Sequence, residues 1–223
     1  MIPFKAIYKE TEISFSIPQS FEELTLKQLC LLNEWDKKDI TKLLSILCNI
    51  EHDIIFNSSS LDIEDKIIPL LSWMKEPHDF ENLILPKHIT IDGKQYQVPK
   101  DIMVKTLGQK ISLQLFLAKA QVERRRKVDC IPFALAIYFQ PEITNTSFSE
   151  DRAKELIPII EQCKMLEAYP TGDFFLSRFI GFLNERAKSY GALRRKSKLR
   201  QALRNWSRLG FLERWMPLQK VTY

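Results

Sequence analysis

Residues 130–139 read CIPFALAIYF and form the longest uninterrupted apolar run of the chain. The run falls well short of the roughly 20 apolar residues that a membrane-spanning helix needs. A helix that is apolar on all sides is typical of the interior of a protein. The sequence therefore predicts a buried core helix here, although Pro132 lies within it.

Helical periodicity extends to both sides of this run. Residues 106–126 are predicted to form a long helix that ends in three consecutive arginines, which suit the negative end of a helix dipole. One stripe of this helix is apolar and consists of Leu107, Ile111, Leu115 and Ala118. Residues 141–146 are expected to form a loop, and residues 149–166 a further helix with acidic residues in its first turn.

Two segments ahead of these helices alternate between apolar and polar residues and predict short hairpins. Residues 4–8 and 13–17 form the strands of the first. The second turns at Asp92-Gly93, the favoured pair for a type I′ turn because both central residues need positive φ. Pairing across that turn sets Ile91 opposite Lys94.

The exits of the two hairpins contain similar residues at a constant spacing. Residues 17–28 include Ile-Pro-x-Ser and then Thr-Leu-x-Gln, and residues 98–109 include Val-Pro-x-Asp and then Thr-Leu-x-Gln. Two interpretations remain open. One is an internal duplication of a hairpin-then-helix unit, whose strands combine in one small sheet, and the other is coincidence between two similarly built strand exits.

Most of the remaining sequence is helical in its periodicity, so the predicted fold class is mainly α (α+β). We expect a helical bundle-like core with two short antiparallel β-hairpins. Further helices are predicted around residues 26–32 and 40–50 and over residues 61–74, the last bent near Pro69. Hydrophobic residues make up 45% of the chain and charged residues 27%, which is typical of a folded protein rather than a disordered one.

The charge balance of the chain changes at residue 178. Residues 178–223 hold twelve Lys or Arg and two Glu, a net charge of +10, whereas residues 1–177 have a net charge of −5. We therefore divide the chain into a mainly helical core with two hairpins, residues 1–177, and a basic, aromatic-rich C-terminal segment, residues 178–223.

No group of residues in the sequence predicts catalysis, a cofactor or a metal. The glycines form neither GxGxxG nor GxxxxGK[ST], and no GxSxG motif is present. The three histidines lie outside HxxxH and HExxH patterns. Adjacent residues point in different directions on a helix, so residues 51–53 (Glu-His-Asp) are expected at a solvated helix C-terminus. We expect a protein that is not an enzyme.

The cysteines indicate a reducing compartment. Cys30, Cys48, Cys130 and Cys163 are widely spaced, form no CxxC pair and are expected to be small buried hydrophobes. Charged residues follow the N-terminus before an apolar stretch of signal-peptide length accumulates, so we expect no secretion and no membrane insertion.

The basic segment is the strongest functional lead. Lys196, Arg200, Arg204 and Arg208 recur every four residues, and an apolar stripe with Trp206 lies beside them on the same predicted helix. Such a helix can bind nucleic-acid phosphates, an acidic protein or a membrane face, and it can equally be a solvated face behind a packed stripe. No sequence-specific nucleic-acid motif accompanies it.

Bulky aromatic residues follow within the same segment. Together with Arg, Trp and Tyr are the residue types most enriched at interface hot spots, although the same aromatics can also pack in a core. The candidate interface therefore consists of Lys196, Arg200, Arg204, Trp206, Arg208, Phe211 and Trp215. The acidic remainder of the chain offers identical subunits a complementary surface.

Three passages resemble small accessory proteins from the structural gene clusters of tailed bacteriophages, especially phages of Bacteroides-like hosts. They are residues 17–29 (IPQSFEELTLKQL), residues 98–109 and residues 169–176 (YPTGDFFL). The resemblance implies a non-enzymatic structural or assembly protein, either a virion ring or connector subunit or a tail-assembly chaperone. It also implies other phage structural proteins as partners and a location in the virion or the host cytoplasm. The competing function is non-specific nucleic-acid binding through the basic helix.

Overall fold

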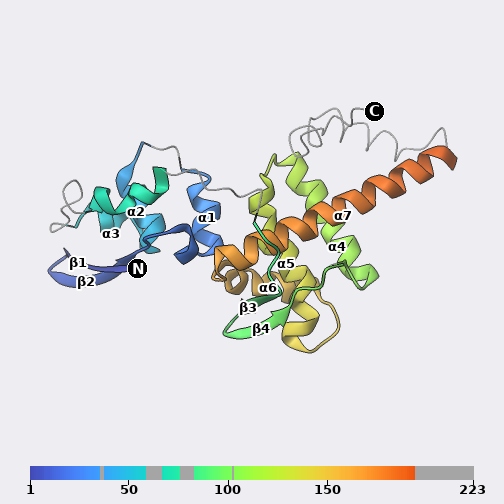
Figure 1. Cartoon of the computed structure of the whole chain (residues 1–223), viewed down its shortest axis with the longest axis horizontal. Helices are drawn as coiled ribbons and strands as arrows, with labels where there is room; N and C mark the ends of the chain where they lie inside the picture. Colours follow the sequence, from blue (N-terminus) through green and yellow to red (C-terminus); the bar gives the residue numbers. More distant parts are fainter. Residues whose placement is uncertain (36–37, 59–66, 76–82, 102, 194–223) are drawn as a thin grey trace.

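A computed structural model describes residues 1–35, 38–58, 67–75, 83–101 and 103–193. Over these residues the protein is mainly helical with two small antiparallel hairpins, as the sequence predicts (Figure 1). In chain order the elements are β1 (Ile2–Tyr8), β2 (Thr11–Ile17), η1 (Phe21–Glu23), α1 (Leu26–Leu32), α2 (Ile40–Cys48), α3 (His52–Phe56), η3 (Ile68–Lys75), β3 (His88–Ile91), β4 (Lys94–Gln97), α4 (Leu107–Val122), α5 (Lys127–Thr144), α6 (Glu150–Glu161) and α7 (Met165–Leu193). The elements η1 and η3 are 3₁₀ helices.

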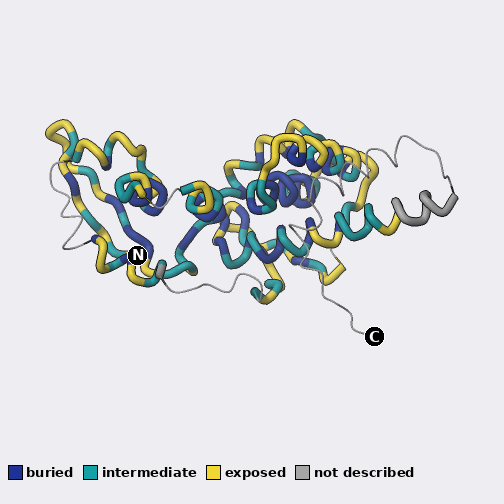
Figure 2. Tube along the Cα trace, turned by 90° about the horizontal axis from the view of Figure 1, so that it is seen from above, coloured by how far each residue is buried: buried dark blue, intermediate teal, exposed yellow. Residues whose placement is uncertain are grey.

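The described elements form two lobes, each built around one cluster of buried side chains, and the clusters meet where Leu26 of α1 joins the second and Val128 and Met165 join the first. The first lobe contains β1 to η3 and the second contains β3 to α7, and they lie at opposite ends of an elongated molecule (Figure 1). Buried residues line the interior of both lobes, and the exposed ones follow their outer rims (Figure 2).

Both hairpins form where the sequence predicts them, although β2 begins at Thr11, two residues earlier than expected, so the first connection is also only two residues long. Strands β1 and β2 are joined by Lys9 and Glu10, with φ of 46° and 64°, and strands β3 and β4 by Asp92 and Gly93, with φ of 50° and 72°. Two consecutive positive φ values define a type I′ turn, so both hairpins use the same connection. Ile91 pairs with Lys94 as expected. The expectation of one combined sheet is wrong, because each hairpin forms a separate two-stranded sheet.

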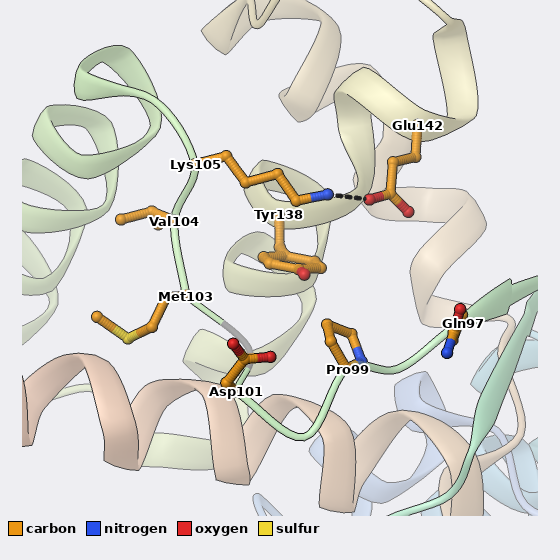
Figure 3. Close-up of a pocket in the computed structure, with 8 residues that line it drawn as sticks. All are labelled: Gln97, Pro99, Asp101, Met103, Val104, Lys105, Tyr138 and Glu142. Atoms are coloured by element: carbon orange, nitrogen blue, oxygen red, sulfur yellow. Dashed lines mark hydrogen bonds and ion pairs between the residues drawn. The ribbon is translucent and has the colours of Figure 1, made fainter.

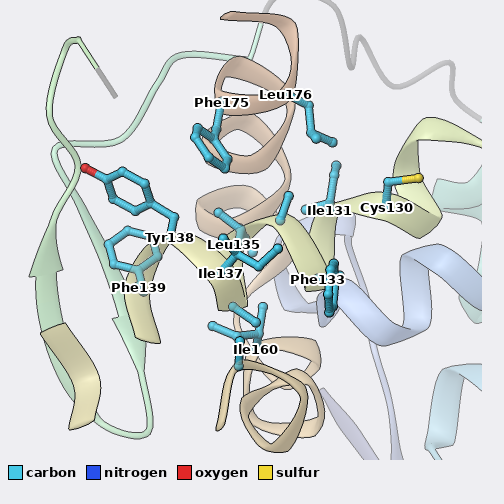
Figure 4. Close-up of a cluster of buried hydrophobic side chains, with 14 of the residues drawn as sticks. Cys130, Ile131, Phe133, Leu135, Ile137, Tyr138, Phe139, Ile160, Phe175 and Leu176 are labelled. Carbon is cyan, nitrogen blue, oxygen red and sulfur yellow. The ribbon is translucent and has the colours of Figure 1, made fainter. Parts of the chain in front are cut away.

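Helix α5 is the centre of the second lobe. Its residues 130–140 are all buried, and α4, α6 and α7 pack around it (Figure 4). Rings of Tyr138 and Phe175 lie with centroids 5.2 Å apart, which joins α5 to α7. The prediction that the apolar run 130–139 is a buried core helix is confirmed.

Two prolines lie within α5, and each leaves the carbonyl four residues earlier without its helical donor. Pro141 frees the carbonyl of Ile137, which accepts a hydrogen bond of 2.9 Å from Gln109 Nε2. Pro132 frees the carbonyl of Val128, toward which the Cys30 thiol donates at 3.6 Å. Side chains from other helices replace the missing donors, so α5 continues to Thr144. The prediction of a loop over residues 141–146 is therefore wrong for residues 141–144, which are helical.

Other predicted helix limits also need correction. Helix α4 ends at Val122 rather than at the arginines, since Arg124 has a φ of 56°. The single helix expected over residues 149–166 is two helices, α6 and α7, and Cys163 lies between them. Glu51 is the N-cap of α3, so residues 51–53 begin a helix instead of ending one. Within the predicted helix 61–74, the described residues from 68 onward form the 3₁₀ helix η3.

The long helix α7 runs across the second lobe and projects beyond it (Figure 1). It continues without a break through residue 178, so the change of charge there does not coincide with an end of secondary structure. Near its start, Gly172 lies so close to Ile131 of α5 that a Cβ atom at this position would overlap the Ile131 side chain. This glycine sets the close approach of α5 and α7.

Arg126 joins the two lobes. Its guanidinium donates hydrogen bonds to the carbonyls of Cys30 and Asn33 at the C-terminal end of α1, and to Asp129 at the start of α5. Terminal carbonyls of a helix lack intrahelical donors and carry partial negative charge. Arg126 therefore binds the C-terminal end of a helix, as the sequence suggests. That helix is α1, however, and not the helix predicted over residues 106–126.

The two lobes repeat one construction beyond their hairpins. Thr25 and Thr106 cap α1 and α4 in capping boxes with Gln28 and Gln109. Both glutamines are buried, and each donates from Nε2 to the next helix of its lobe: Gln28 to the Leu47 carbonyl at 2.6 Å, and Gln109 to Ile137. These shared contacts favour duplication over coincidence. Two capping boxes that are alike by chance would not also need a glutamine hydrogen bond to the next helix.

Candidate protein-binding surface

The interface residues that the sequence predicts cannot be placed. Lys196, Arg200, Arg204, Trp206, Arg208, Phe211 and Trp215 all lie outside the described residues, which end at residue 193. The surface described below comes instead from the folded lobes.

One face of α4 exposes a continuous row of apolar side chains. Leu107 is 70% exposed, Ile111 46%, Leu115 65% and Val122 83%, and Ala118 in the same row is also exposed. These residues follow one another at helical spacings of three and four, so they share one face about 22 Å long at 1.5 Å per residue. We call this row the α4 face.

The α4 face is open because the opposite side of the helix is fixed in the core. Leu113 and Leu117 on that side are buried at 0% and 3% exposure. Gln109 bonds to α5 as described above, and Ser112 donates to Glu150 at the start of α6 at 2.9 Å. Because these contacts set the rotation of α4 about its axis, the α4 face points outward. An amphipathic helix normally turns its apolar stripe inward, so this exposure is unusual.

The charges around the α4 face are mostly positive. Between residues 107 and 122 the helix holds Lys110 and Lys119 and no Asp or Glu. The side chain of Lys119 is 71% exposed and forms an ion pair of 3.7 Å with Glu123, just beyond the end of the helix. Lys105, just before the helix, is paired with Glu142 at 2.5 Å. An apolar face with a cationic rim suits an apolar ligand surface that carries acidic groups.

A hollow of about 500 Å³ adjoins the N-terminal end of α4 (Figure 3). Its polar groups include the Lys105–Glu142 ion pair, and the Lys105 ammonium lies 5.6 Å from the centre of the Tyr138 ring. Burial raises the pKa of Tyr138 to about 12. At neutral pH the hollow thus presents a neutral phenol beside an ion pair, and Asp101 also lies on its lining.

His52, an ionisable residue singled out in the sequence, has structural partners. His52 Nε2 lies 2.9 Å from Thr41 Oγ1 and 3.5 Å from the carboxylate of Asp39, the N-cap of α2. Backbone donation from Lys42 lowers the pKa of Asp39, as expected for a capping carboxylate. His52 therefore belongs to the cap of a helix.

The four cysteines are unpaired and their thiols are kept neutral. Burial raises the pKa of each of Cys30, Cys48, Cys130 and Cys163 to about 12. A nucleophilic or metal-binding cysteine is a thiolate with a lowered pKa. Among the described residues no three His, Cys, Asp or Glu side chains gather into a possible metal site.

Comparisons with known proteins give no relative: no family model, no curated protein and no solved structure matches the chain. In the described part of the chain, every helix is too short or too polar to cross a membrane.

The sequence contained the α4 face but did not identify it as a site. The sequence predicts an apolar stripe at residues 107, 111, 115 and 118, but an apolar stripe at helical spacing usually packs in the interior of a protein. The signal in the sequence was a second apolar row on the same helix, at residues 113, 117 and 120. Only one of the two rows can face α5.

Proposed function

We propose that this chain is a non-enzymatic assembly protein that acts by binding other proteins. On the resemblance of residues 17–29, 98–109 and 169–176, we assign it to the structural and assembly proteins of tailed bacteriophages, as a virion ring or connector subunit or a tail-assembly factor. Its partners are then other phage structural proteins, and it works in the virion or the host cytoplasm.

The observation that carries the proposal is the α4 face. Fully covering one side chain of the size of Leu or Val contributes about 1.5–3 kcal/mol, and four such side chains are exposed here in a row. Leaving these side chains in water does not stabilise a folded lobe. A protein that docks on a partner, in contrast, gains binding free energy when the partner covers them.

Fractionation of particle assembly tests the proposal. In cells producing the phage that encodes the chain, we expect the protein to co-sediment with capsid, connector or tail intermediates and its deletion to stop assembly at one defined step. Presence in purified virions identifies a ring or connector subunit, and presence in intermediates alone identifies a tail-assembly factor. A chain that sediments free of all intermediates, and whose deletion leaves particle yield unchanged, contradicts the proposal.

Non-specific nucleic-acid binding is the alternative, and the net charge of +10 on residues 178–223 favours it. The two functions differ in their response to salt. Binding through Lys196, Arg200, Arg204 and Arg208 should weaken steeply as salt rises, and removing one phosphate contact on duplex DNA should reduce the log–log slope by about 0.9. A protein interface anchored by Trp215 should depend little on salt.

A further inference from the structure

The start of α1 in the first lobe and the start of α4 in the second are equivalent positions. Both follow a hairpin with a type I′ turn and a proline exit, and both begin with a Thr-Leu-x-Gln capping box. Leu26 thus corresponds to Leu107, and Cys30 corresponds to Ile111. The surroundings of these pairs can therefore be compared residue by residue.

In the first lobe, another segment of the chain covers this position. The turn between α6 and α7 pairs with the start of α1 as a short antiparallel bridge, in which Leu26 N–H donates to the Cys163 carbonyl at 2.9 Å. Met165 N–H donates to the Leu24 carbonyl at 2.8 Å, and Met165 then begins helix α7. As a result Leu24 and Leu26 are completely buried.

In the second lobe, the equivalent position is uncovered. Leu107 is 70% exposed where Leu26 is 0% exposed. The N–H of Leu107 and the carbonyl of Lys105, which correspond to the two bridging groups of the first lobe, have no hydrogen-bond partner among the described residues. The apolar row then continues along α4 through Ile111 and Leu115 to Val122, well beyond the length of α1.

We propose that the α4 face docks a segment of a partner protein that enters as an extended bridge to Lys105 and Leu107 and continues as an acidic amphipathic helix along α4. This deepens the proposed function and rests on it, since the partner is another component of the assembly. The bridge repeats the one that α1 makes inside the chain. The apolar side of the partner helix covers Ile111, Leu115 and Val122.

The charges of the surface select an acidic partner. The rim carries Lys110 and Lys119 with no acid within the helix, and the segment that covers α1 in the first lobe is itself net acidic, with Glu161, Glu167 and Asp173 against Lys164 between residues 161 and 173. Complementary charge steers and aligns such a docking.

Three other occupants fit less well. Residues 194–223 of the chain itself hold nine Lys or Arg and one Glu, so they have the same sign as the rim. A second copy has its own α6–α7 turn already held by its own α1. A membrane surface is disfavoured because the exposed row contains no Trp or Tyr, the residues that anchor proteins at a bilayer interface.

Site-specific photo-cross-linking tests the proposal in the full-length chain during particle assembly. The probe is Leu115→p-benzoylphenylalanine, and the matched control is Phe56→p-benzoylphenylalanine on α3, where the native side chain is 66% exposed. We expect an adduct from position 115 and none from position 56. Peptide mapping should locate the adduct on a segment of another assembly protein with net negative charge.

A synthetic peptide of the mapped segment then measures the contact. Leu107→Asp, which keeps a residue suited to the first turn of a helix, should weaken binding of this peptide about thirtyfold, the change expected for a buried anchor of about 2 kcal/mol. Lys119→Glu should weaken it more at low salt than at high salt. Phe56→Ala should leave binding unchanged.

The outcomes separate this inference from the proposed function. If the chain co-sediments with assembly intermediates but position 115 cross-links to lipid, to nucleic acid, to residues 194–223, to a second copy, to a basic segment or to nothing, the inference is wrong and the function stands. If the chain joins no intermediate at all, the proposed function is wrong.

Discussion

Gly172→Ala should destabilise the protein, although alanine is the better helix former. Replacing glycine by alanine inside a helix contributes about 1 kcal/mol of stability. At this position the added Cβ would overlap Cγ2 of Ile131 and come within 3.1 Å of its Cβ. Rotation of the Ile131 side chain cannot move its own Cβ, so α5 and α7 must separate.

The size of the effect follows from these two opposing contributions. Overpacking a core costs about 1–3 kcal/mol, and contact with a backbone-fixed atom places this site at the upper end, about 3 kcal/mol. The net loss is then about 2 kcal/mol. For a chain of this length, thermal unfolding followed by far-UV circular dichroism should show a midpoint lower by about 4–8 °C.

Gly181→Ala on the same helix is the matched control. No atom lies within 4 Å of a Cβ built there, so only the gain in helix propensity applies and the midpoint should rise by about 2–4 °C. Ile131→Ala should cost about 2–5 kcal/mol alone, and the double mutant should cost about 2 kcal/mol less than the sum of the two single substitutions, because the overlapping Cγ2 is gone while the Cβ contact at 3.1 Å remains. Equal stabilisation by both glycine substitutions, or additive double mutants, would refute the close approach of α5 and α7.

Three further predictions concern the helices and the buried thiols. Leu113→Ala should lower the free energy of unfolding by about 2–5 kcal/mol, whereas Leu115→Ala, two residues away on the α4 face, should change it by less than about 0.5 kcal/mol in urea titrations; equal losses would contradict the orientation of α4. Thr25→Ala and Thr106→Ala should each cost about 1 kcal/mol by the same assay, since both side chains accept from the third residue of their helices, and a loss at one position alone would argue against the repeated capping. Because burial raises the pKa of the Cys48 thiol from its ordinary 9.0 to about 12, the unfolded chain releases a proton between these pH values that the folded chain keeps. Stability is then full below pH 9 and should decline above it by about 1.4 kcal/mol per pH unit for this thiol, and Cys48→Ala should reduce the slope by that amount; an unchanged slope would show that this thiol is accessible to water.

Features that depend on neighbouring residues could be predicted from the sequence. The pair Asp92-Gly93 specifies a two-residue turn by its own backbone preferences, and the register of β3 and β4 follows from it. The same holds for the Thr-Leu-x-Gln boxes, whose first contacts span three residues. Burial of residues 130–139 was predictable because a segment without polar residues has no side that favours water.

Features that depend on distant contacts could not be predicted in this way. A helix through Pro141 requires the amide of Gln109 to reach the Ile137 carbonyl, and the two residues are 28 positions apart. Arg126 bonds to carbonyls 93 and 96 positions away, so its role at the end of α1 leaves no local pattern. Separate sheets likewise follow from the distance between the lobes rather than from either hairpin.

The α4 face shows why a periodic pattern alone does not separate a core from a binding surface. Helix α4 is apolar on two sides, and water disfavours both equally, so the pattern predicts that both are covered without saying by what. Within the described residues only the side with Leu113 and Leu117 has a partner. The first lobe supplies the missing comparison, because there the side equivalent to the α4 face is closed by a bridge to the α6–α7 turn. Among the described residues this repeated unit is closed at one position and open at the equivalent one, and this difference is the basis for the proposal that another protein closes the open position.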